Sequence, residues 1–190
     1  MELVEKLCIG AVVLDVGCGC GASTRRILEI CEGISYVVGI DIDADRLAIA
    51  RNVLRDDPRT DLVCATASKL PFRNRCVNVA FMINVLHELD QRLVDEALRE
   101  VGRILVSTGH LIVVDRVRSS DASESERLTI VAEDLRHRIL ELVKGLRAWG
   151  VRRADEYLRK TSRTRLRTHP PRGPCHGSTP ELRGVSSQMG

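Results

Sequence analysis

The sequence predicts an α/β protein whose parallel sheet is covered by helices on both faces. Two observations support this prediction. Short, nearly continuous apolar runs alternate with amphipathic helical patterns, and a glycine-rich turn joins the first run to the first helical pattern. Such strands are typical of parallel sheets, and right-handed crossovers between them produce a doubly wound arrangement. The length of 190 residues suits one core, which the 3% aromatic content predicts to be aliphatic.

The first part of the chain supplies three predicted strands and two helices. Ala11–Val16 is apolar except for one aspartate and ends at glycines, so it is predicted to be a buried strand. Ser23–Cys31 is predicted to be a helix, because its apolar residues recur three and four positions apart. Tyr36–Asp41 is a second apolar strand, followed by the helical pattern of Ala44–Arg55. Asp61–Ala65 is a short third strand.

The next part supplies two further strands and two helical patterns. Val77–Ile83 is a long apolar run, and the helical pattern of Leu93–Leu105 follows it. His110–Val117 is the fifth strand, and Ser123–Leu146 is helical. The apolar residues of this last segment form a stripe at helical spacing that is expected to pack on the core. The stripe consists of Leu128, Val131, Leu135, Ile139, Leu142 and Leu146.

These elements divide the chain into three predicted segments. Residues 1–121 form the core, residues 122–161 a helical segment packed on it, and residues 162–190 a basic, disordered tail. The predicted sheet has five parallel strands in the order 3-2-1-4-5. A sixth and seventh strand are not expected, because no four consecutive residues beyond Thr161 are apolar and prolines interrupt the segment. The edge of the fifth strand is therefore expected to be shielded by the long helix or by a partner chain.

Charge is distributed unevenly along the chain. The net charge is +3, but residues 144–190 hold 11 Lys/Arg and 3 Asp/Glu, a balance of +8. Such a segment can attract nucleic acid. Aromatic residues that could stack on bases are scarce there, so a solvated basic tail is the favoured interpretation.

Features that the sequence lacks lead to expectations about cellular location and metal binding. No apolar run reaches the roughly 18–20 residues of a membrane span, and the first residues lack a signal-peptide pattern, so a cytoplasmic protein without membrane contact is expected. The seven cysteines are interpreted as reduced thiols. No metal site is expected, because no second close Cys/His pair complements Cys18-x-Cys20.

The strongest candidate for chemistry is the glycine-rich turn within residues 13–24. Gly17 and Gly19 allow a tight turn and close approach of a ligand, and the following helix offers free N–H groups. Asp15 can accept a hydrogen bond from a ligand ammonium, directly or through water. Asp41, at the end of the second strand, is placed to bind both ribose hydroxyls of an adenosine ligand.

Taken together, these motifs resemble those of class I, Rossmann-like, S-adenosylmethionine-dependent methyltransferases, especially the small-molecule type of quinone biosynthesis. The resemblance runs from about Ala11 to Asp115. It implies S-adenosylmethionine as cofactor and in-line transfer of a methyl group to a small-molecule acceptor. The matching motifs are Asp15-x-Gly17-x-Gly19-x-Gly21, Gly39-Ile40-Asp41-Ile42, Leu70-Pro71-Phe72, Asn84-Val85-Leu86-His87-Glu88-Leu89 and Val101-Gly102-Arg103-Ile104-Leu105 followed by Gly109-His110-Leu111.

The resemblance also implies roles for individual residues. Ile42 would lie against the adenine, while Asn84 and Val85 would flank the sulfonium and the substrate entrance. Contacts with the methionine portion are implied for Gly17, Cys18 and Gly19, with Asp15 nearby and Asp41 on the ribose. The loop implied at the adenine edge consists of Thr66, Ala67 and Ser68.

Two positions depart from the family pattern, and one residue has two interpretations. The family often has Asp where Thr66 stands, so Thr66, Ser68 or a backbone carbonyl must accept from the adenine amino group if binding is to be kept. Asn78 also replaces a frequent Asp, with an effect expected on local strand packing. His87 is the candidate base if the acceptor must lose a proton; a helix-start residue packed beside the pocket is the favoured alternative.

Two other functions remain open from the sequence. Gly17-x-Gly19-x-x-Ala22 also fits the fingerprint of a nicotinamide-dependent (NAD(P)) oxidoreductase, although no hydride-transfer residues follow it. A non-catalytic cofactor-binding subunit that serves a partner protein is the second alternative.

Overall fold

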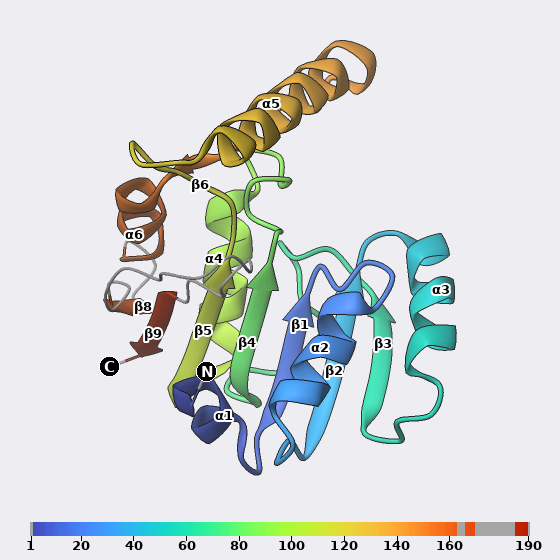
Figure 1. Cartoon of the computed structure of the whole chain (residues 1–190). Helices are drawn as coiled ribbons and strands as arrows, with labels where there is room; N and C mark the ends of the chain where they lie inside the picture. Colours follow the sequence, from blue (N-terminus) through green and yellow to red (C-terminus); the bar gives the residue numbers. More distant parts are fainter. Residues whose placement is uncertain (1, 163–165, 170–184, 190) are drawn as a thin grey trace.

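The computed structural model describes residues 2–162, 166–169 and 185–189, which form a seven-stranded sheet with helices around it and a separate β6–β7 pair (Figure 1). The strands are β1 (Val12–Val16), β2 (Tyr36–Asp41), β3 (Thr60–Cys64), β4 (Val77–Ile83), β5 (Leu105–Val114), β6 (Val117–Arg118), β7 (Arg152–Arg153), β8 (Leu166–His169) and β9 (Val185–Met189). The helices are α1 (Glu2–Cys8), α2 (Ala22–Ile30), α3 (Ala44–Leu54), α4 (Val94–Ile104), α5 (Glu124–Lys144) and α6 (Ala154–Ser162). Among the described residues, no helix is long and apolar enough to cross a membrane.

The five predicted parallel strands are confirmed. β1 pairs with β2 and β4, β2 with β3, and β4 with β5, all in parallel, which gives the order 3-2-1-4-5. The helices α2, α3 and α4 begin and end within one residue of the predicted bounds. β5 begins earlier than predicted, directly after α4, and α1 was not predicted.

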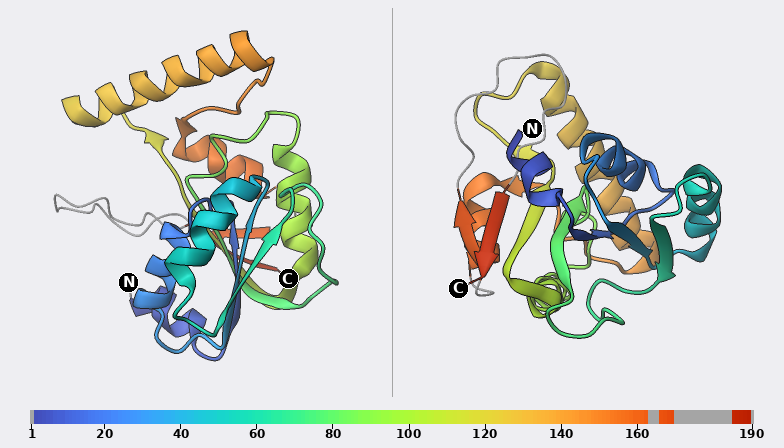
Figure 2. Two further views of the ribbon diagram at one scale, coloured as in Figure 1. Left: turned by 90° about the vertical axis from the view of Figure 1, so that its right-hand side faces the viewer. Right: turned by 90° about the horizontal axis from the view of Figure 1, so that it is seen from below.

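Helices cover both faces of this sheet, with α1 and α2 on one face and α4 on the other (Figure 2). Two separate apolar cores result, because consecutive side chains of a strand point to opposite faces. Val13 of β1 belongs to the core under α1 and α2, whereas its neighbour Leu14 belongs to the core that contains α4. In the same way, Phe81 and Met82 of β4 belong to different cores.

Strand register determines where the functional edge lies. Val16 of β1 lies beside Ile40 of β2 and Met82 of β4. The turns after these three parallel strands therefore lie at one edge of the sheet, where doubly wound folds bind ligands.

The last two strands correct the sequence-based prediction. β9 pairs antiparallel with β5, and β8 pairs antiparallel with β9. The prediction that the sheet lacks a hairpin is therefore wrong. The predicted disordered tail is also wrong for Leu166–His169 and Val185–Met189, which are strands. Residues 163–165, 170–184 and 190 of the predicted tail lie outside the described residues. The edge of β5 is occupied by β9, so the predicted shielding of this edge by the long helix or by a partner chain is wrong. Short terminal strands can be joined by backbone hydrogen bonds alone, which an apolar pattern does not report.

The predicted packing of the α5 stripe is also wrong. α5 projects from the body of the molecule (Figure 1), and on this helix only Ile130 and His137 are buried. The stripe residues Leu128 and Leu142 are 64% and 80% exposed. Helical spacing shows that apolar residues share a face, but it does not show which way that face points. The part of the segment that does pack is α6, where Tyr157 meets the Trp149 ring edge-on at 4.8 Å.

Arg103 explains why two of the sequence motifs occur together. Its guanidinium donates to the carbonyl oxygens of Leu70 (3.1 Å) and Phe72 (2.8 Å) and pairs with Glu100 (2.7 Å). The Leu70 N–H donates in turn to Glu100, at 2.9 Å. The Leu70-Pro71-Phe72 loop is therefore held on α4 by charge-assisted hydrogen bonds.

We predict that Arg103→Ala lowers the free energy of unfolding by about 1.5–3 kcal/mol, because it removes hydrogen bonds to a charged group and leaves the loop carbonyls unpaired. Urea denaturation of both proteins measures the change. Arg99→Ala is the matched control, since Arg99 lies exposed on the same helix and should cost about 0.5 kcal/mol or less. Equal effects of the two substitutions would contradict the assigned role of Arg103.

Candidate functional site

The turn between β1 and α2 requires glycine for two different reasons. Gly17 has φ +75°, and a Cβ atom there would lie 2.6 Å from Val85 Cγ2, so the turn touches the loop after β4. Gly19 has φ +52°, but a Cβ atom there would meet nothing within 4 Å. The backbone at Gly19 therefore borders open space into which a ligand can fit.

Backbone hydrogen bonds tie this turn to the end of β2. The N–H groups of Gly17 and Cys18 both donate to the Ile40 carbonyl, at 2.8 and 2.9 Å. The Gly19 N–H donates to Asp41 Oδ2 at 2.8 Å, and Asp43 N–H donates to Asp41 Oδ1 at 2.9 Å. The predicted cofactor residues Gly17, Gly19 and Asp41 are thus brought together, and the Asp41 carboxylate is held at the glycine turn.

Asp15 lies completely buried beside the same turn. Its Oδ2 accepts hydrogen bonds from the Ser23 and Thr24 hydroxyls, both at 2.7 Å. Its Oδ1 is buried and has no hydrogen-bond partner among the described residues. Burial raises the pKa of Asp15, although the two hydroxyls oppose this shift. An unpaired buried acceptor is costly, so a donor on a ligand suits this position.

The turn after β2 presents an apolar side chain, and the loop after β3 presents two hydroxyl groups. Ile42, directly after β2, is 73% exposed. The Ala65 N–H donates to the Asp41 carbonyl at 3.0 Å, which keeps the loop after β3 next to Asp41. In that loop the hydroxyls of Thr66 and Ser68 lie 3.0 Å apart. The predicted adenine-contacting residues, Ile42, Thr66, Ala67 and Ser68, therefore follow neighbouring strands at one edge.

Asn84 and Val85 complete the predicted set at the end of β4. Asn84 has φ +55°, a left-handed conformation that Asn tolerates better than most residues. Its N–H donates to the Val114 carbonyl at 2.7 Å, and the residue is exposed. Val85 is buried against Gly17. Cys18 is buried as well, and burial raises the pKa of its thiol to about 12, so it is not a thiolate at neutral pH.

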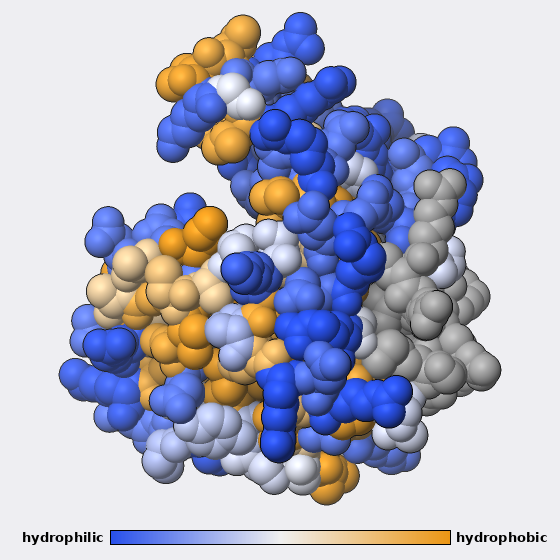
Figure 3. All heavy atoms as spheres, turned by 180° about the vertical axis from the view of Figure 1, so that it is seen from behind, coloured by the Kyte–Doolittle hydropathy of each residue, from blue (hydrophilic) through white to orange (hydrophobic). Residues whose placement is uncertain are grey.

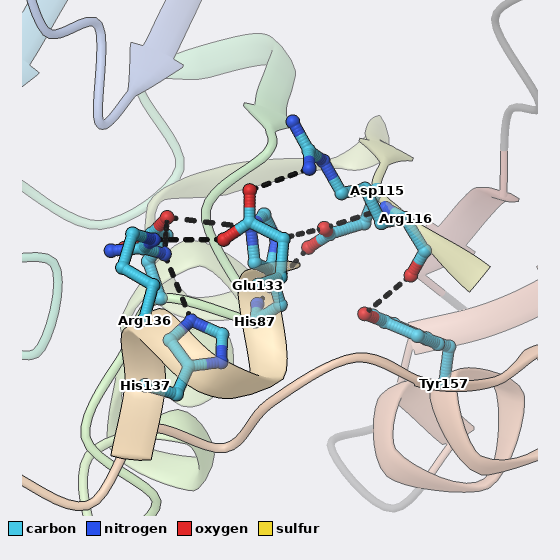
Figure 4. Close-up of polar contacts among 8 residues, drawn as sticks. His87, Asp115, Arg116, Glu133, Arg136, His137 and Tyr157 are labelled. Carbon is cyan, nitrogen blue, oxygen red and sulfur yellow. Dashed lines mark hydrogen bonds and ion pairs between the residues drawn. The ribbon is translucent and has the colours of Figure 1, made fainter. Parts of the chain in front are cut away.

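His87 lies between two carboxylates (Figure 4). Its side chain is 1% exposed; Nδ1 hydrogen-bonds Asp115, and Nε2 lies 3.4 Å from Glu88 Oε1. Burial acts to lower the pKa of His87, but the hydrogen bonds and charges of Asp115 and Glu88 outweigh it and raise the pKa to about 9. His87 is therefore a cation at neutral pH.

The same network fastens α5 to the loops after β4 and β5 (Figure 4). Arg136 donates to Glu88, to His137 Nε2 at 2.9 Å and to Glu133 at 2.8 Å. Arg116 donates to Glu133 at 2.5 Å. Burial acts to raise the pKa of Glu88, but the hydrogen bonds and charges of His87 and Arg136 outweigh this effect and lower the pKa to about 2.

This network also brings together side chains of types that bind metals. Candidate ligand atoms of His87, Glu88, Glu133 and His137 all lie within 4.8 Å of one another. The guanidinium of Arg136 already donates to the two glutamates and to His137. Of this group, only His87 and Glu88 belong to a motif recognisable in the sequence. Glu133 and His137 lie among many other polar residues of the α5 segment, so no pattern in the sequence singled them out.

Comparison with known proteins agrees with this geometry. Residues 13–109 match the family described as "Methyltransferase domain". The ubiquinone/menaquinone biosynthesis C-methyltransferase UbiE of Hahella chejuensis is 36% identical over 112 residues, which cover 56% of this chain and 43% of that protein. UbiE of Pseudomonas aeruginosa (strain LESB58) is 35% identical over 113 residues, covering 56% and 42%. The chain thus spans less than half the length of these curated relatives.

Solved structures share the fold over nearly the whole chain. A SAM-dependent methyltransferase from Methanosarcina mazei superposes with a TM-score of 0.73 at 16% identity, covering 100% of this chain and 97% of the other. An S-adenosylmethionine-dependent methyltransferase from Mesorhizobium loti has a TM-score of 0.70 at 20% identity, covering 99% and 96%. The family match decides against the nicotinamide-dependent alternative. The chain belongs to the methyltransferase domain family and has the class I, Rossmann-like fold of S-adenosylmethionine-dependent methyltransferases.

Proposed function

We propose that this chain binds S-adenosylmethionine and transfers its methyl group to a small-molecule acceptor by in-line displacement. The observation that carries the proposal is the meeting, at one sheet edge, of the glycine turn, the Asp41 carboxylate and the loop that begins at Asn84. Each supplies a surface that a different part of the cofactor needs.

The methionine portion is assigned to the glycine turn. The backbone of Gly17, Cys18 and Gly19 borders the open space at Gly19, which accommodates the carboxylate end of the cofactor near the start of α2. The unpaired Oδ1 of Asp15 is buried in this structure, so it would accept from the cofactor ammonium, directly or through water, only after the turn shifts to admit the donor. Asp41 accepts from the two ribose hydroxyls, because a carboxylate oxygen that already accepts one N–H keeps a further lone pair.

The adenine is assigned to the surface formed by Ile42 and the loop after β3. The exposed side chain of Ile42 offers an apolar contact for the ring. The hydroxyl of Thr66 or Ser68 accepts from the adenine amino group, in place of the carboxylate that the family often has there. Ala67 lies between them and lets the ring approach closely.

The chemical step needs little from the protein beyond position. The bound cofactor supplies a methyl group that its sulfonium already activates. Asn84 and Val85 orient the acceptor side of the site, and alignment of two reactants contributes up to roughly 7–11 kcal/mol in favourable cases. The names of the UbiE relatives make a quinone-type ring carbon the first acceptor class to test.

The decisive experiment is a methyl-transfer assay with labelled S-adenosylmethionine. Hydroquinones and phenols are offered beside hydroxyl, thiol and amine acceptors, and product formation is followed by mass. Transfer to any of them supports the enzyme. Tight cofactor binding without transfer to any acceptor would instead favour the non-catalytic cofactor-binding subunit.

We predict that Asp41→Ala weakens S-adenosylmethionine binding by about 10- to 150-fold, because it removes charge-assisted hydrogen bonds worth roughly 1.5–3 kcal/mol. Titration calorimetry measures the dissociation constant. Asp61→Ala is the control, since Asp61 is an exposed carboxylate near the start of neighbouring β3 that pairs with Tyr36. Unchanged affinity of Asp41→Ala would refute the ribose assignment.

For His87, the geometry favours a positioning role over that of a base. Its two ring nitrogens face Asp115 and Glu88, and with a pKa of about 9 it has no free lone pair at neutral pH. We propose that it holds the loop after β4 beside the pocket. Acting as a base would require Nε2 to leave Glu88 and lose its proton.

The pKa of His87 generates a pH-dependent prediction for stability. A histidine with a folded-state pKa of about 9 and an unfolded value near 6.5 stabilises the fold fully below pH 6.5 and loses this contribution as pH rises to about 9. The free energy of unfolding should therefore fall by roughly 3 kcal/mol over this interval. Urea denaturation at several pH values tests it.

His87→Gln should remove most of this pH dependence. His137→Gln should keep it, because burial and the Arg136 charge lower the pKa of His137 and move its effect to lower pH. If wild type and His87→Gln show the same slope between pH 6.5 and 9, the assigned charge on His87 is wrong.

A further inference from the structure

α5 carries an apolar stripe that nothing in the described part of the chain covers. Figure 3 shows apolar side chains gathered on the projecting end of the helix. A contiguous exposed apolar surface of this kind marks an interaction site. The six residues of the stripe are 47–80% exposed: Leu128, Val131, Leu135, Ile139 and Leu142 on α5, and Leu146 just after it.

The stripe points away from the body of the protein. Leu128, Leu135 and Leu142 follow one another at intervals of seven, so they lie on one side of the helix. Ile130 and His137, the buried residues of α5, lie about half a turn around the helix from them. The body-facing side is thus already occupied by the network around Arg136. The stripe therefore lies opposite the surface of α5 that this network holds to the body.

Both ends of α5 are capped by local interactions that do not involve this face. Ser123 and Glu126 form a reciprocal capping box at its start, and Gly145 adopts the left-handed conformation at its end. The helix ends therefore need no partner, and the exposed stripe is left available for one.

The stripe is symmetric about Leu135. Val131 and Ile139 lie four residues before and after it, and Leu128 and Leu142 lie seven before and after. A second α5 running antiparallel across Leu135 would place apolar side chains opposite apolar side chains along the whole contact. This is the self-complementary arrangement that a twofold dimer requires.

Charge has the opposite symmetry about the same point. Residues 124–134 include four acidic residues and one basic residue, whereas residues 136–147 include four basic residues and one acidic residue. On one flank of the stripe, Arg127 lies eight residues before Leu135 and Glu141 six residues after it; both are exposed and neither has an ion-pair partner among the described residues. Antiparallel pairing would bring Arg127 of each copy beside Glu141 of the other, and it also aligns the helix dipoles favourably.

We infer that this chain forms a homodimer in which the α5 helices of two copies pack antiparallel across Leu135. The partner that covers the stripe is a second copy of this chain. When one α5 is laid antiparallel on another, apolar residues meet apolar residues, and acidic residues meet basic ones. The dimer does not depend on the methyltransferase assignment.

Sedimentation of the full chain over about a hundredfold concentration range tests the dimer. Leu135→Glu should raise the dimer dissociation constant at least about tenfold, because the residue meets its own copy at the centre of the contact. Leu142→Glu, at the most exposed position, should act in the same direction. Ile49→Glu on α3 is the control for an exposed apolar residue outside α5, and thermal unfolding checks that each variant folds.

Charge reversal tests the antiparallel register. Arg127→Glu and Glu141→Arg should each weaken the dimer, and the double variant should restore it. The two residues are about 21 Å apart along one helix, so rescue requires contact between copies. A wild type that stays monomeric overturns the proposal, and so does a dimer that Leu135→Glu leaves intact or a double variant that gives no rescue. A monomer that instead floats with anionic lipid vesicles would show that a membrane surface, not a second copy, covers the stripe.

Discussion

The candidate site depends on how the backbone N–H groups of the turn after β1 are satisfied. Buried or half-buried N–H groups must find acceptors, and this turn finds them on β2: the Ile40 carbonyl and the Asp41 carboxylate. The same bonds that complete the turn therefore hold the Asp41 carboxylate at the glycine turn, in the position proposed for ribose binding. The lack of a side chain at Gly17 then allows the turn to touch Val85.

A second set of polar contacts connects this edge of the sheet to α5. His87, Asp115 and Glu88 belong to the loops after β4 and β5, and Arg136 reaches them from α5. The side chains of His87 and Asp115 are buried, and buried charges are stable only when paired. Those of Glu88 and Arg136, which extend the alternation of carboxylates and cations, are partly exposed. The first consequence of this network is structural, since it sets the direction in which α5 leaves the body. Its second concerns the site, since it holds the loop that carries Asn84 and Val85.

The edge strand β5 and the outer face of α5 differ in whether the chain itself covers them. The edge of β5 is completed within the chain, because β9 supplies the backbone partners that an open strand lacks. The outer face of α5 is completed by nothing in the described residues, although its apolar content is high. A helix satisfies its own backbone hydrogen bonds, so an uncovered helix can persist where an uncovered strand would associate. What it leaves exposed is side-chain surface, which is suited to selective pairing.

The sequence by itself determined the parallel sheet, its strand order and the grouping of the glycine turn, Asp41 and Asn84, because these depend on local patterns and on a handed crossover rule. It also linked the Leu70-Pro71-Phe72 loop and Arg103 to one family without revealing that they bind each other. Only the tertiary structure decided the β8–β9 hairpin, the charged state of His87 and the outward direction of the α5 stripe. Each of these depends on which groups meet across long sequence separations: backbone donors with backbone acceptors, His87 with Asp115, and Arg136 with Glu88. Periodicity records that a surface is apolar, and only packing decides what that surface faces.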